Sequence, residues 1–376
     1  MRNVKYINSY ANKEHHEQFN AILLFALNSY FRVKMYSGKD SKNNMYRTLR
    51  EKGYKIRNID NQNLLILKGK SGIPNFIRFL FSALYNLLIL LCSKKNDILV
   101  YNFNNPLSLY SLNKVNSLLK REILIFCHGE MELLINNEGG FLAKILRWHL
   151  RCFFLKKRKL FIKYCVLGDS IIENLKPIIK EKIDDFISID HPYLFEKRGI
   201  KEKSISSRIS FATIGELNDF KGLDSYLKLL DKVDKENKNF LVIGNVSHKL
   251  EEFEKRGVIV KGKDNFIERK EFENLISDID YALYFYTKDK YKITASGAVL
   301  DAINARKPII ALKNDYFSYL FGKYGQIGYL FESIEEMSNR IDLLNDNKKI
   351  FNFEKYIEEL SVDSFSKKLY MLISKM

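Results

Sequence analysis

The sequence has few cysteines and histidines, and their spacing excludes the common metal motifs. The four cysteines contain no CxxC pair, and the six histidines contain no HxxxH or HExxH pair. A zinc site or a disulfide framework is therefore not expected, and this cysteine usage fits a reducing cytosol. We predict that the chain binds no metal through a recognisable motif.

The chain also lacks a signal-peptide pattern and any long low-complexity tract. In its first residues, MRNVKYINSYANKEHH, one basic residue is followed by mixed polar residues without an apolar core. Hydrophobic residues make up 46% of the 376 positions, and charged residues make up 28%. This composition argues against a disordered chain and predicts two folded domains of ordinary size.

Acidic residues are too few to balance the basic ones. The chain has 62 Lys and Arg against 45 Asp and Glu, which gives a formal charge of +17. Such an excess predicts an anionic partner, and nucleic acid, anionic lipid headgroups and nucleotide phosphates all qualify. A general richness in Lys, Asn and Ile accounts for part of the excess.

The first half of the chain alternates between strand-like and helix-like apolar patterns. Phe19, Ile22 and Leu23 recur at helical spacing, for example, and a short apolar run lies on either side of that helix. Such alternation is typical of a parallel sheet built from βαβ units. The predicted strands are 4–9, 33–36, 55–59, 64–67, 97–103, 123–126, 164–167 and 188–192. The predicted helices are 15–30, 41–52, 76–92 and 170–179.

The most apolar run extends from Phe76 to Cys92 and is followed by two lysines. It is shorter than the roughly 20 apolar residues that a spanning helix needs, and it contains Arg78 and Asn86. A buried strand follows it directly, so we expect a crossover helix that is buried or lies on a membrane surface. A transmembrane helix is the weaker alternative.

Basic and aromatic residues alternate from Lys144 to Lys163. No acid occurs between Glu138 and Asp169, and Trp148 is one of several aromatic residues among the cations. A basic aromatic helix of this kind predicts contact with an anionic lipid surface. A solvated face over a core helix is the alternative, and nucleic acid is a third choice because no recognition motif accompanies the charge.

The second half begins with a charged, patternless segment, 196–208, which is typical of an interdomain linker. A second alternating series follows, with strands at 209–214, 240–243, 258–260, 281–285, 308–312 and 328–331. Helices are predicted at 223–233, 249–256, 271–276, 297–304, 334–344 and 365–374. We therefore predict one domain over 1–195, a second over 209–360 and a C-terminal helix within 361–376.

Two segments of the second series have the character of phosphate sites. In KITASGAVLDA, Ser296 and Gly297 open an apolar helix, whose first N–H groups and dipole favour an anion. Asp301 lies one turn further, on the same side, where a ribose diol would be within reach. In TIGELNDFKG, Lys221 opens a helix after a strand that ends at Gly215. Alone, each is more typical of an ordinary capped helix or of a surface lysine; together they fall on one edge of one predicted sheet.

The first series has a polar strand end of its own. The strand 123–126 runs into CHGEME, which places His128, Gly129 and Glu130 at its carboxyl end. Ligands bind at that edge in open parallel sheets. A loop histidine without a chemical role is an equally good interpretation of the position alone.

These segments together resemble a known family. TIGELNDFKGLDSYL and ITASGAVLDAINARKPIIAL are similar to the donor half of retaining GT-B glycosyltransferases of family four, and CHGE is similar to their histidine loop. The resemblance implies an α/β fold of two Rossmann-like, doubly wound parallel-sheet domains facing across a cleft. It also implies a last helix that crosses back onto the first domain.

The resemblance further implies a hexosyltransferase that needs no metal or other cofactor. Its donor would be a nucleotide-diphosphate sugar, and its acceptor a glycan or polyprenyl-linked molecule of bacterial surface polysaccharide synthesis. Such an enzyme would be cytoplasmic and peripheral on the inner face of the membrane, which Lys144 to Lys163 would contact. No nucleic-acid partner is expected.

By resemblance, the donor site comprises Gly215, Lys221, Lys292, Thr294, Ser296, Gly297 and Asp301. Lys221 corresponds to the lysine on the donor diphosphate, Ser296 and Gly297 to the segment that touches the phosphates, and Asp301 to the acid on the ribose. In the other domain, His128 corresponds to the histidine near the sugar. Glu130 is added as an alternative polar contact.

The sequence departs from the family pattern at three places. Glu216 stands where the family usually has Arg, Ile293 stands where a second acid is usual, and Ser9-Tyr10-Ala11-Asn12 replaces a Gly-Gly loop. An acid beside a diphosphate repels it, so Lys292 is predicted to compensate, with Lys288 or Lys290 as substitutes. Retention of configuration is therefore less firmly implied than the fold.

The mechanism implied is electrostatic. Lys221, Lys292 and the helix opening at Gly297 would stabilise the charge that grows on the leaving nucleoside diphosphate. Two other functions remain open: a nucleotide-sugar epimerase of the same architecture, and a non-catalytic basic protein that binds membrane or nucleic acid.

Overall fold

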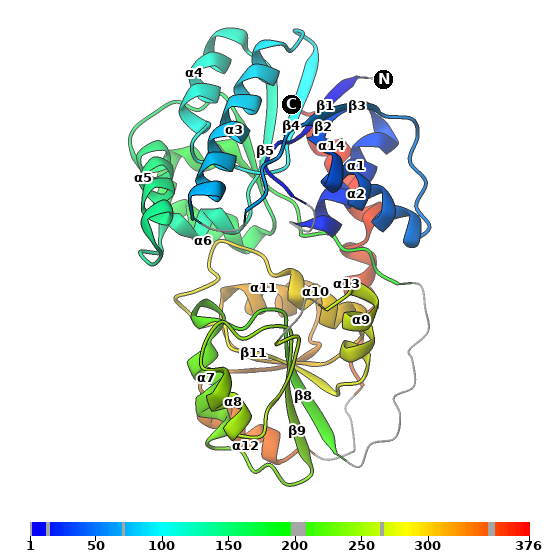
Figure 1. The fold of residues 1–376 in the computed structure, drawn as a ribbon, viewed down its shortest axis with the longest axis vertical. Coiled ribbons are helices and arrows are strands. Elements are labelled where there is room, and N and C mark those ends of the chain that lie inside the picture. Colours follow the sequence, from blue (N-terminus) through cyan, green and yellow to red (C-terminus); the bar gives the residue numbers. More distant parts are fainter. Residues whose placement is uncertain (1, 13–15, 70–71, 197–207, 264–266, 345–349) are drawn as a thin grey trace. The chain divides into compact units, whose positions relative to one another are not determined.

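The structure is a computed structural model that describes residues 2–12, 16–69, 72–196, 208–263, 267–344 and 350–376. The chain divides into two compact units, each built around its own parallel sheet (Figure 1). Unit 1 comprises Met1–Leu194, Ile293–Ala295 and Leu360–Met376. Unit 2 comprises Phe195–Lys292 and Ser296–Glu359. Most of the predicted linker, 197–207, lies outside the described residues.

Unit 1 contains a seven-stranded parallel sheet with the order β3-β2-β1-β4-β5-β6-β7. Chain order reverses between β1 and β4, which makes this pair the switch point where doubly wound sheets bind ligands. The central strands are largely buried because helices cover both faces, and all of β4 is buried. The strands are β1 (Asn3–Asn8), β2 (Arg32–Gly38), β3 (Asp60–Leu64), β4 (Asp97–Tyr101), β5 (Glu122–Phe126), β6 (Lys163–Val166) and β7 (Phe186–Ser188).

Helices cover the two faces of this sheet in two groups. One face packs against α1 (Glu17–Tyr30), α2 (Lys39–Glu51) and α14 (Val362–Ser374). The other packs against α3 (Gly72–Leu91), α4 (Leu109–Leu119), α5 (Phe141–Leu155) and α6 (Asp169–Ile179). Two short 3-10 helices, η1 (Gly129–Leu134) and η2 (Lys180–Asp185), follow β5 and α6. Right-handed crossovers require this division, because the chain changes direction across the sheet after β3.

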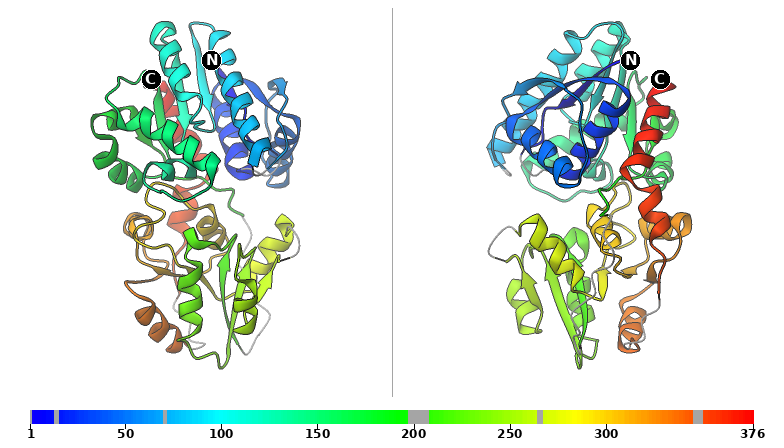
Figure 2. Two further views of the ribbon diagram at one scale, coloured as in Figure 1. Left: turned by 60° about the vertical axis from the view of Figure 1, so that its left-hand side comes forward. Right: turned by 90° about the vertical axis from the view of Figure 1, so that its right-hand side faces the viewer.

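The C-terminal helix α14 is part of the first core. Phe365, Leu369 and Ile373 are buried, and the Phe365 ring centroid lies 6.3 Å from that of Phe19 on α1. Figure 2 shows α14 in red beside the blue helices. The last residues of the chain therefore complete the fold of the first.

Unit 2 repeats the topology with six strands in the order β10-β9-β8-β11-β12-β13, so its switch point lies between β8 and β11. The strands are β8 (Ile209–Ile214), β9 (Lys238–Ile243), β10 (Ile259–Lys261), β11 (Tyr281–Tyr284), β12 (Ile309–Leu312) and β13 (Gly328–Phe331). One face packs against α7 (Leu223–Leu230), α8 (Leu250–Lys255) and α12 (Ile334–Asp342). The unit also contains the 3-10 helix η3 (Asp219–Lys221), α9 (Arg269–Ser277), α10 (Gly297–Asn304), α11 (Asp315–Tyr324) and α13 (Glu354–Glu359).

The two predicted Rossmann-like sheets are confirmed, but several elements differ. The separate strands at 55–59 and 64–67 are wrong, because a single strand, β3, lies at 60–64. It is an exposed edge strand of sequence DNQNL, so it has no apolar pattern to reveal it. The last strand of unit 1 spans 186–188 instead of 188–192, and the basic segment is helical only to Leu155. The helices α4, α11 and α13 were not predicted.

Candidate functional site

In unit 2, the loop after β8 is shaped by glycine. Gly215 has φ +83°, and a Cβ on Gly244 would lie only 2.2 Å from the Gly215 carbonyl oxygen. The Gly215 N–H donates to the Ile243 carbonyl at 2.8 Å. The two loops that leave β8 and β9 therefore run in direct backbone contact, which only glycine permits.

This loop presents Lys221 at the carboxyl end of β8. The Asn218 side chain accepts the Lys221 backbone N–H at 3.0 Å, and Gly222 follows with φ +82°. A Cβ at Gly222 would lie 2.2 Å from the Phe285 carbonyl oxygen, so η3 is seated against the end of β11. The Lys221 Nζ atom lies 3.6 Å from the position of a Cβ on Gly215. The Lys221 ammonium therefore lies beside Gly215, at the switch point of unit 2.

The surroundings of Lys221 perturb its charge. Burial lowers the pKa of the Lys221 ammonium, and the nearby carboxylates of Glu216 and Asp301 oppose this by favouring the charged form. An anion at this place would stabilise the ammonium further, because it would add negative charge where water is partly excluded. The lysine is therefore suited to hold a phosphate.

The opening of α10 lies beside the same glycine. The Ala298 Cβ is 3.8 Å from the position of a Cβ on Gly215, and Gly297 is exposed with nothing within 4 Å of a Cβ. The Ser296 hydroxyl makes no capping bond to the helix and instead pairs with the Tyr286 hydroxyl at 2.9 Å. The first turn of α10 and the ammonium of Lys221 thus both lie beside Gly215, and a helix start next to a lysine is a favourable place for an anion.

Aromatic rings hold the segment that leads into α10. Tyr291 has φ +58°, and its ring stacks on that of Tyr286 at 4.1 Å between centroids. The Phe220 ring lies 5.0 Å from Tyr291, and the Lys290 ammonium donates to the Asp219 carbonyl at 3.0 Å. These contacts join the loop after β11 to the loop after β8. A left-handed tyrosine is a costly conformation that the stacking stabilises.

Asp301 occupies the predicted place on α10 but has a partner that the sequence did not reveal. Its carboxylate accepts from Arg269 at 2.7 Å, and its side chain is 11% exposed. Arg269 also bonds Glu273 at 2.8 Å. The two substitutes considered for Lys292 are engaged as well, since Lys288 pairs with Glu332 at 2.7 Å and Lys290 bonds the loop backbone. Lys292 itself is half-buried and is the last residue of the first segment of unit 2.

In unit 1, His128 lies at the end of β5 and is buried. Its Nε2 lies 2.9 Å from the Asn102 carbonyl, which only accepts, so Nε2 carries the proton. The His16 ring stacks on it at 4.4 Å, and the Phe19 ring meets it edge-on at 4.7 Å. The imidazole is therefore fixed in orientation and tautomer.

Glu130 is tied to the same residue. The His128 backbone N–H donates to both carboxylate oxygens, at 2.9 and 3.1 Å. Burial raises the pKa of Glu130 to about 8, although this N–H and the Asn104 side chain favour the carboxylate. At neutral pH the group is mostly protonated and gains its charge in mildly alkaline solution.

Residues 293–295 also belong to unit 1 and lie against η1. The Ile293 N–H donates to the buried carboxylate of Glu132 at 2.8 Å. A Cβ on Gly129 would lie 3.7 Å from the Thr294 hydroxyl. Thr294 is thus grouped with His128 and Glu130, whereas Gly215, Lys221, Ser296, Gly297 and Asp301 gather at the switch point of unit 2. Glu132, the second acid of CHGEME, was missed because nothing in the sequence pairs it with Ile293.

Buried amides and hydroxyls occupy the switch point of unit 1, where the family has a Gly-Gly loop. Asn8 bonds Ser41 at 2.9 Å and also accepts the Ala11 N–H at 3.2 Å. Asn102, after β4, bonds Asn20 at 2.8 Å. The run NFNNP after β4 was the available signal for this polar edge.

The described residues contain no group of three or more His, Cys, Asp or Glu side chains that could hold a metal ion. Independence from metal nevertheless stays a prediction about the reaction.

No family model and no curated protein matches the sequence. Solved structures match over the whole chain. The lipopolysaccharide outer core galactosyltransferase WaaB aligns with a TM-score of 0.64 at 14% identity, covering 100% of both chains. HepE of Anabaena, solved with UDP-glucose, gives 0.63 at 10% and also covers 100% of both. TarM of S. aureus, solved with UDP, gives 0.63 at 12%, covering 99% of this chain and 100% of TarM.

The chain has the GT-B fold. The architecture implied by the two sequence segments is thereby confirmed: two doubly wound parallel sheets follow one another along the chain. Because identity to these structures is so low, GT-B describes the fold of this chain, and its substrates have to be argued from the site.

Proposed function

We propose that this chain is a glycosyltransferase that moves a sugar from a nucleotide-diphosphate sugar to a glycan or lipid-linked acceptor. The observation that carries the proposal is that the Lys221 ammonium and the first turn of α10 both lie beside Gly215. Structures of the same fold have been solved with UDP, UDP-glucose and ADP, which supports a nucleotide at this switch point.

In the proposed reaction the donor diphosphate rests on Lys221 and the opening of α10. As the bond from the sugar to the diphosphate breaks, negative charge grows on the leaving group, and these fixed donors stabilise it. Lys292, at the end of the unit 2 loop, adds positive charge that offsets Glu216. The Asp301 carboxylate accepts a ribose hydroxyl while its bond to Arg269 keeps it in place.

His128 and Glu130 serve the sugar and the acceptor in this proposal. The bond to the Asn102 carbonyl holds the imidazole in one orientation before any substrate binds. The fold therefore decides which side of the ring can contact a substrate. Glu130 is a polar contact for a hydroxyl group, as a neutral acid at low pH and a carboxylate above its raised pKa. Metal independence belongs to the same proposal.

We place the enzyme in the cytoplasm, peripheral on the inner face of the membrane, with contact through Lys144 to Lys163. The arginines and the lysines of that segment differ in their contacts. Arg147 and Arg151 turn inward and donate to backbone carbonyls, including that of Leu134 at 3.0 Å. Lys144, Lys156, Lys157 and Lys159 are half-buried or exposed. The acceptor is then a glycan of surface polysaccharide synthesis, and no nucleic acid is involved.

The test is thermal stabilisation by UDP, GDP, ADP and dTDP at matched ionic strength. One base should stabilise wild type by about 2.7 kcal/mol at a hundred times its dissociation constant, and Lys221→Ala should lose the stabilisation. Lys228→Ala, which changes an exposed lysine on the neighbouring helix, is the control and should keep it. Equal shifts with every nucleotide in both variants would refute the donor site.

Activity is then measured with the matching nucleotide sugar in the presence of EDTA. Release of the nucleoside diphosphate that depends on a glycan or lipid-linked acceptor supports a transferase. Conversion of the nucleotide sugar to an isomer, without an acceptor, would instead identify an epimerase.

A further inference from the structure

Helix α3 buries polar side chains on the face that packs against the sheet. Arg78, Ser82 and Asn86 are buried there among the apolar Phe79, Ile89 and Leu90. The hydroxyls of Ser82 and Ser9 pair at 2.9 Å, and Ser9 donates to the Asn86 side chain at 2.6 Å. Arg78 bonds the Tyr10 hydroxyl at 3.1 Å. The side of α3 that a soluble helix usually makes apolar is therefore mixed and held partly by hydrogen bonds.

The outward side of α3 is apolar instead. Leu80, Leu84 and Leu88 expose 46%, 52% and 45% of their surface. With the other exposed residues of this side they recur at intervals of three, four and seven, so all lie on one stripe of the helix. We call this set the α3 stripe: Ile73, Leu80, Phe81, Leu84, Leu88 and Leu91. A continuous exposed stripe marks an interaction site more often than chance.

The helices that adjoin the stripe carry charge of one sign. The sequences of α3, α4 and α5 contain no Asp or Glu. Acids occur on α6, which covers the same face of the sheet and has Asp169 and Glu173, and on the opposite face, where α2 has Asp40 and Glu51. Lys94 and Lys95 follow α3 and are exposed. Such segregation of charge complements an anionic surface.

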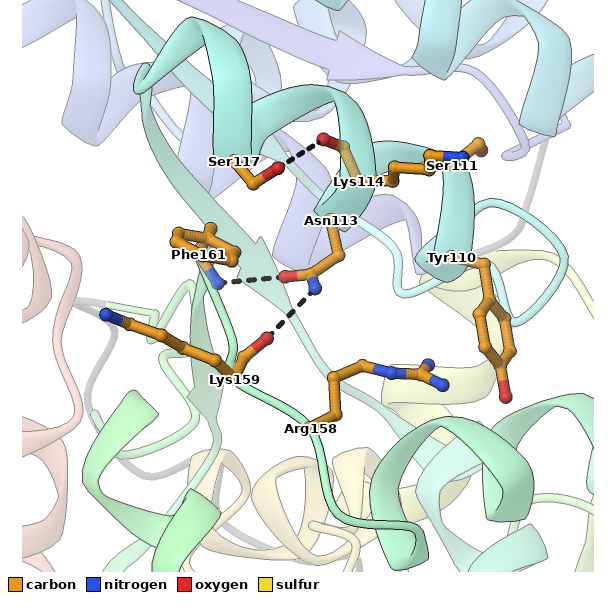
Figure 3. A pocket seen from close by; sticks show the side chains of 8 residues that line it. All are labelled: Tyr110, Ser111, Asn113, Lys114, Ser117, Arg158, Lys159 and Phe161. Atoms are coloured by element: carbon orange, nitrogen blue, oxygen red, sulfur yellow. Dashed lines mark hydrogen bonds between the residues drawn. The ribbon is translucent and has the colours of Figure 1, made fainter.

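A groove of about 590 Å³ between α4 and the segment after α5 is also lined by cations, here next to aromatic rings (Figure 3). The Arg158 guanidinium lies over the Tyr110 ring at 4.1 Å, and the Lys159 ammonium lies 5.5 Å from the Phe161 ring centroid. The Asn113 side chain donates to the Lys159 carbonyl at 3.1 Å and accepts the Phe161 N–H at 2.8 Å. These cations are therefore held in place on the fold.

We infer that the outer face of α3, α4 and α5 is a docking surface for an anionic bilayer, and that the α3 stripe enters its interface. This goes beyond the contact proposed for Lys144 to Lys163, because it assigns the apolar part of the contact to a different helix. Lys114 on α4 and the cations of the segment after α5 face the lipid phosphates, and Trp148, 62% exposed on α5, lies at the headgroup level.

The helix lies on the membrane instead of crossing it. Among the residues that the structure describes, α3 is the helix long and apolar enough to span a bilayer by length and composition. Spanning would pull Arg78, Ser82 and Asn86 out of their bonds to Tyr10 and Ser9 and place them in hydrocarbon. Lying flat keeps every one of these bonds and buries only the stripe.

The experiment measures binding of the full chain to vesicles of phosphatidylcholine alone or mixed with phosphatidylglycerol. The chain has one tryptophan, Trp148, so its emission reports the surface directly. We expect sedimentation with the anionic vesicles and a blue shift of the emission. The triple variant Leu80→Gln, Leu84→Gln, Leu88→Gln should bind roughly tenfold or more weakly.

The control makes the same chemical change at exposed apolar residues of unit 2: Ile259→Gln, Leu343→Gln, Ile350→Gln. It should bind like wild type, and both triple variants should keep the wild-type response to nucleotide, which separates this inference from the donor site. Unchanged binding of the α3 variant, with loss on reversing Lys156, Lys157 and Lys159, would overturn the inference. So would absence of vesicle binding, or a wild-type dimer in solution that the α3 variant disrupts.

Discussion

Glu130, just after β5, and Asp301, on α10, are two acids of the candidate site with different surroundings. Asp301 has the guanidinium of Arg269 at 2.7 Å. Glu130 accepts N–H groups but has no cation bonded to it among the described contacts, and burial raises its pKa to about 8. One acid is therefore bonded to a cation, and the other changes charge near pH 8.

This difference predicts a pH dependence of stability from Glu130. Its pKa in the folded protein exceeds the unfolded value, so its contribution is fully present below the unfolded pKa and is lost as the pH rises through about 8. Between about pH 5 and pH 8 the loss is roughly 1 kcal/mol per pH unit. Glu130→Gln, which stays neutral, should gain stability over wild type across that range in urea unfolding.

Glu138→Gln is the matched control, because it neutralises an exposed acid a few residues away. It should not show the advantage over wild type that Glu130→Gln gains as the pH rises from 5 to 8. A constant difference between Glu130→Gln and wild type from pH 5 to pH 9 would contradict the raised pKa. An optimum of the proposed transferase activity that moves in Glu130→Gln would in addition connect the titration to the reaction.

At the scale of elements, the loop from β8 to α7 depends on Gly222. Its φ is +82°, and a Cβ would collide with the Phe285 carbonyl. Gly222→Ala should therefore destabilise unit 2 by roughly 2 kcal/mol or more and weaken nucleotide binding, because Lys221 precedes it. Gly322→Ala is the control, since that glycine lies within α11 with open space around it, and it should be neutral or stabilising. Equal stability of the two variants would contradict the close approach.

Some helices and strands could be predicted from the sequence and others could not. Strands β8 and β13 and helix α10 have the predicted ends, because strands covered on both faces read as apolar runs and Ser296-Gly297 marks a helix start. The strand β3 could not be found, since its edge position leaves it polar. Unpredicted α4 has the sequence LYSLNKVNSLL, in which Asn113 and Asn116 face inward to bond the segment before β6. Its buried side is thus partly polar, which obscures the helical pattern.

The candidate site, too, could be predicted only in part. Gly215, Lys221 and Gly297 come together because each lies in the connection that follows β8 or β11, the two strands at the switch point, and topology brings these connections to one edge of the sheet. The partners that set their electrostatics are separated along the chain. Arg269 lies 32 positions from Asp301, and Glu132 lies 161 positions from Ile293. No local pattern encodes such pairs, so a sequence can locate the binding edge and still leave its charge balance unknown.

At the scale of the whole molecule, the chain is two folding units that exchange short segments. Leu360–Met376 belongs to unit 1, although unit 2 precedes it in sequence. Phe365 on α14 is 2% exposed and packs beside Phe19. Unit 1 is therefore incomplete until the end of the chain has been made, which predicts that C-terminal truncation exposes the apolar face of α1.

The last prediction tests this division. Phe365→Ala should destabilise unit 1 by roughly 3 to 5 kcal/mol through the cavity it leaves, and the unfolding transition seen by Trp148, which lies in unit 1, should move to lower denaturant. Phe253→Ala removes a ring of the same burial from unit 2 and should move the transition seen by nucleotide binding instead. A Trp148 transition that responds to Phe253→Ala and not to Phe365→Ala would contradict the assignment of α14, because a helix outside the core of unit 1 cannot contribute to its stability.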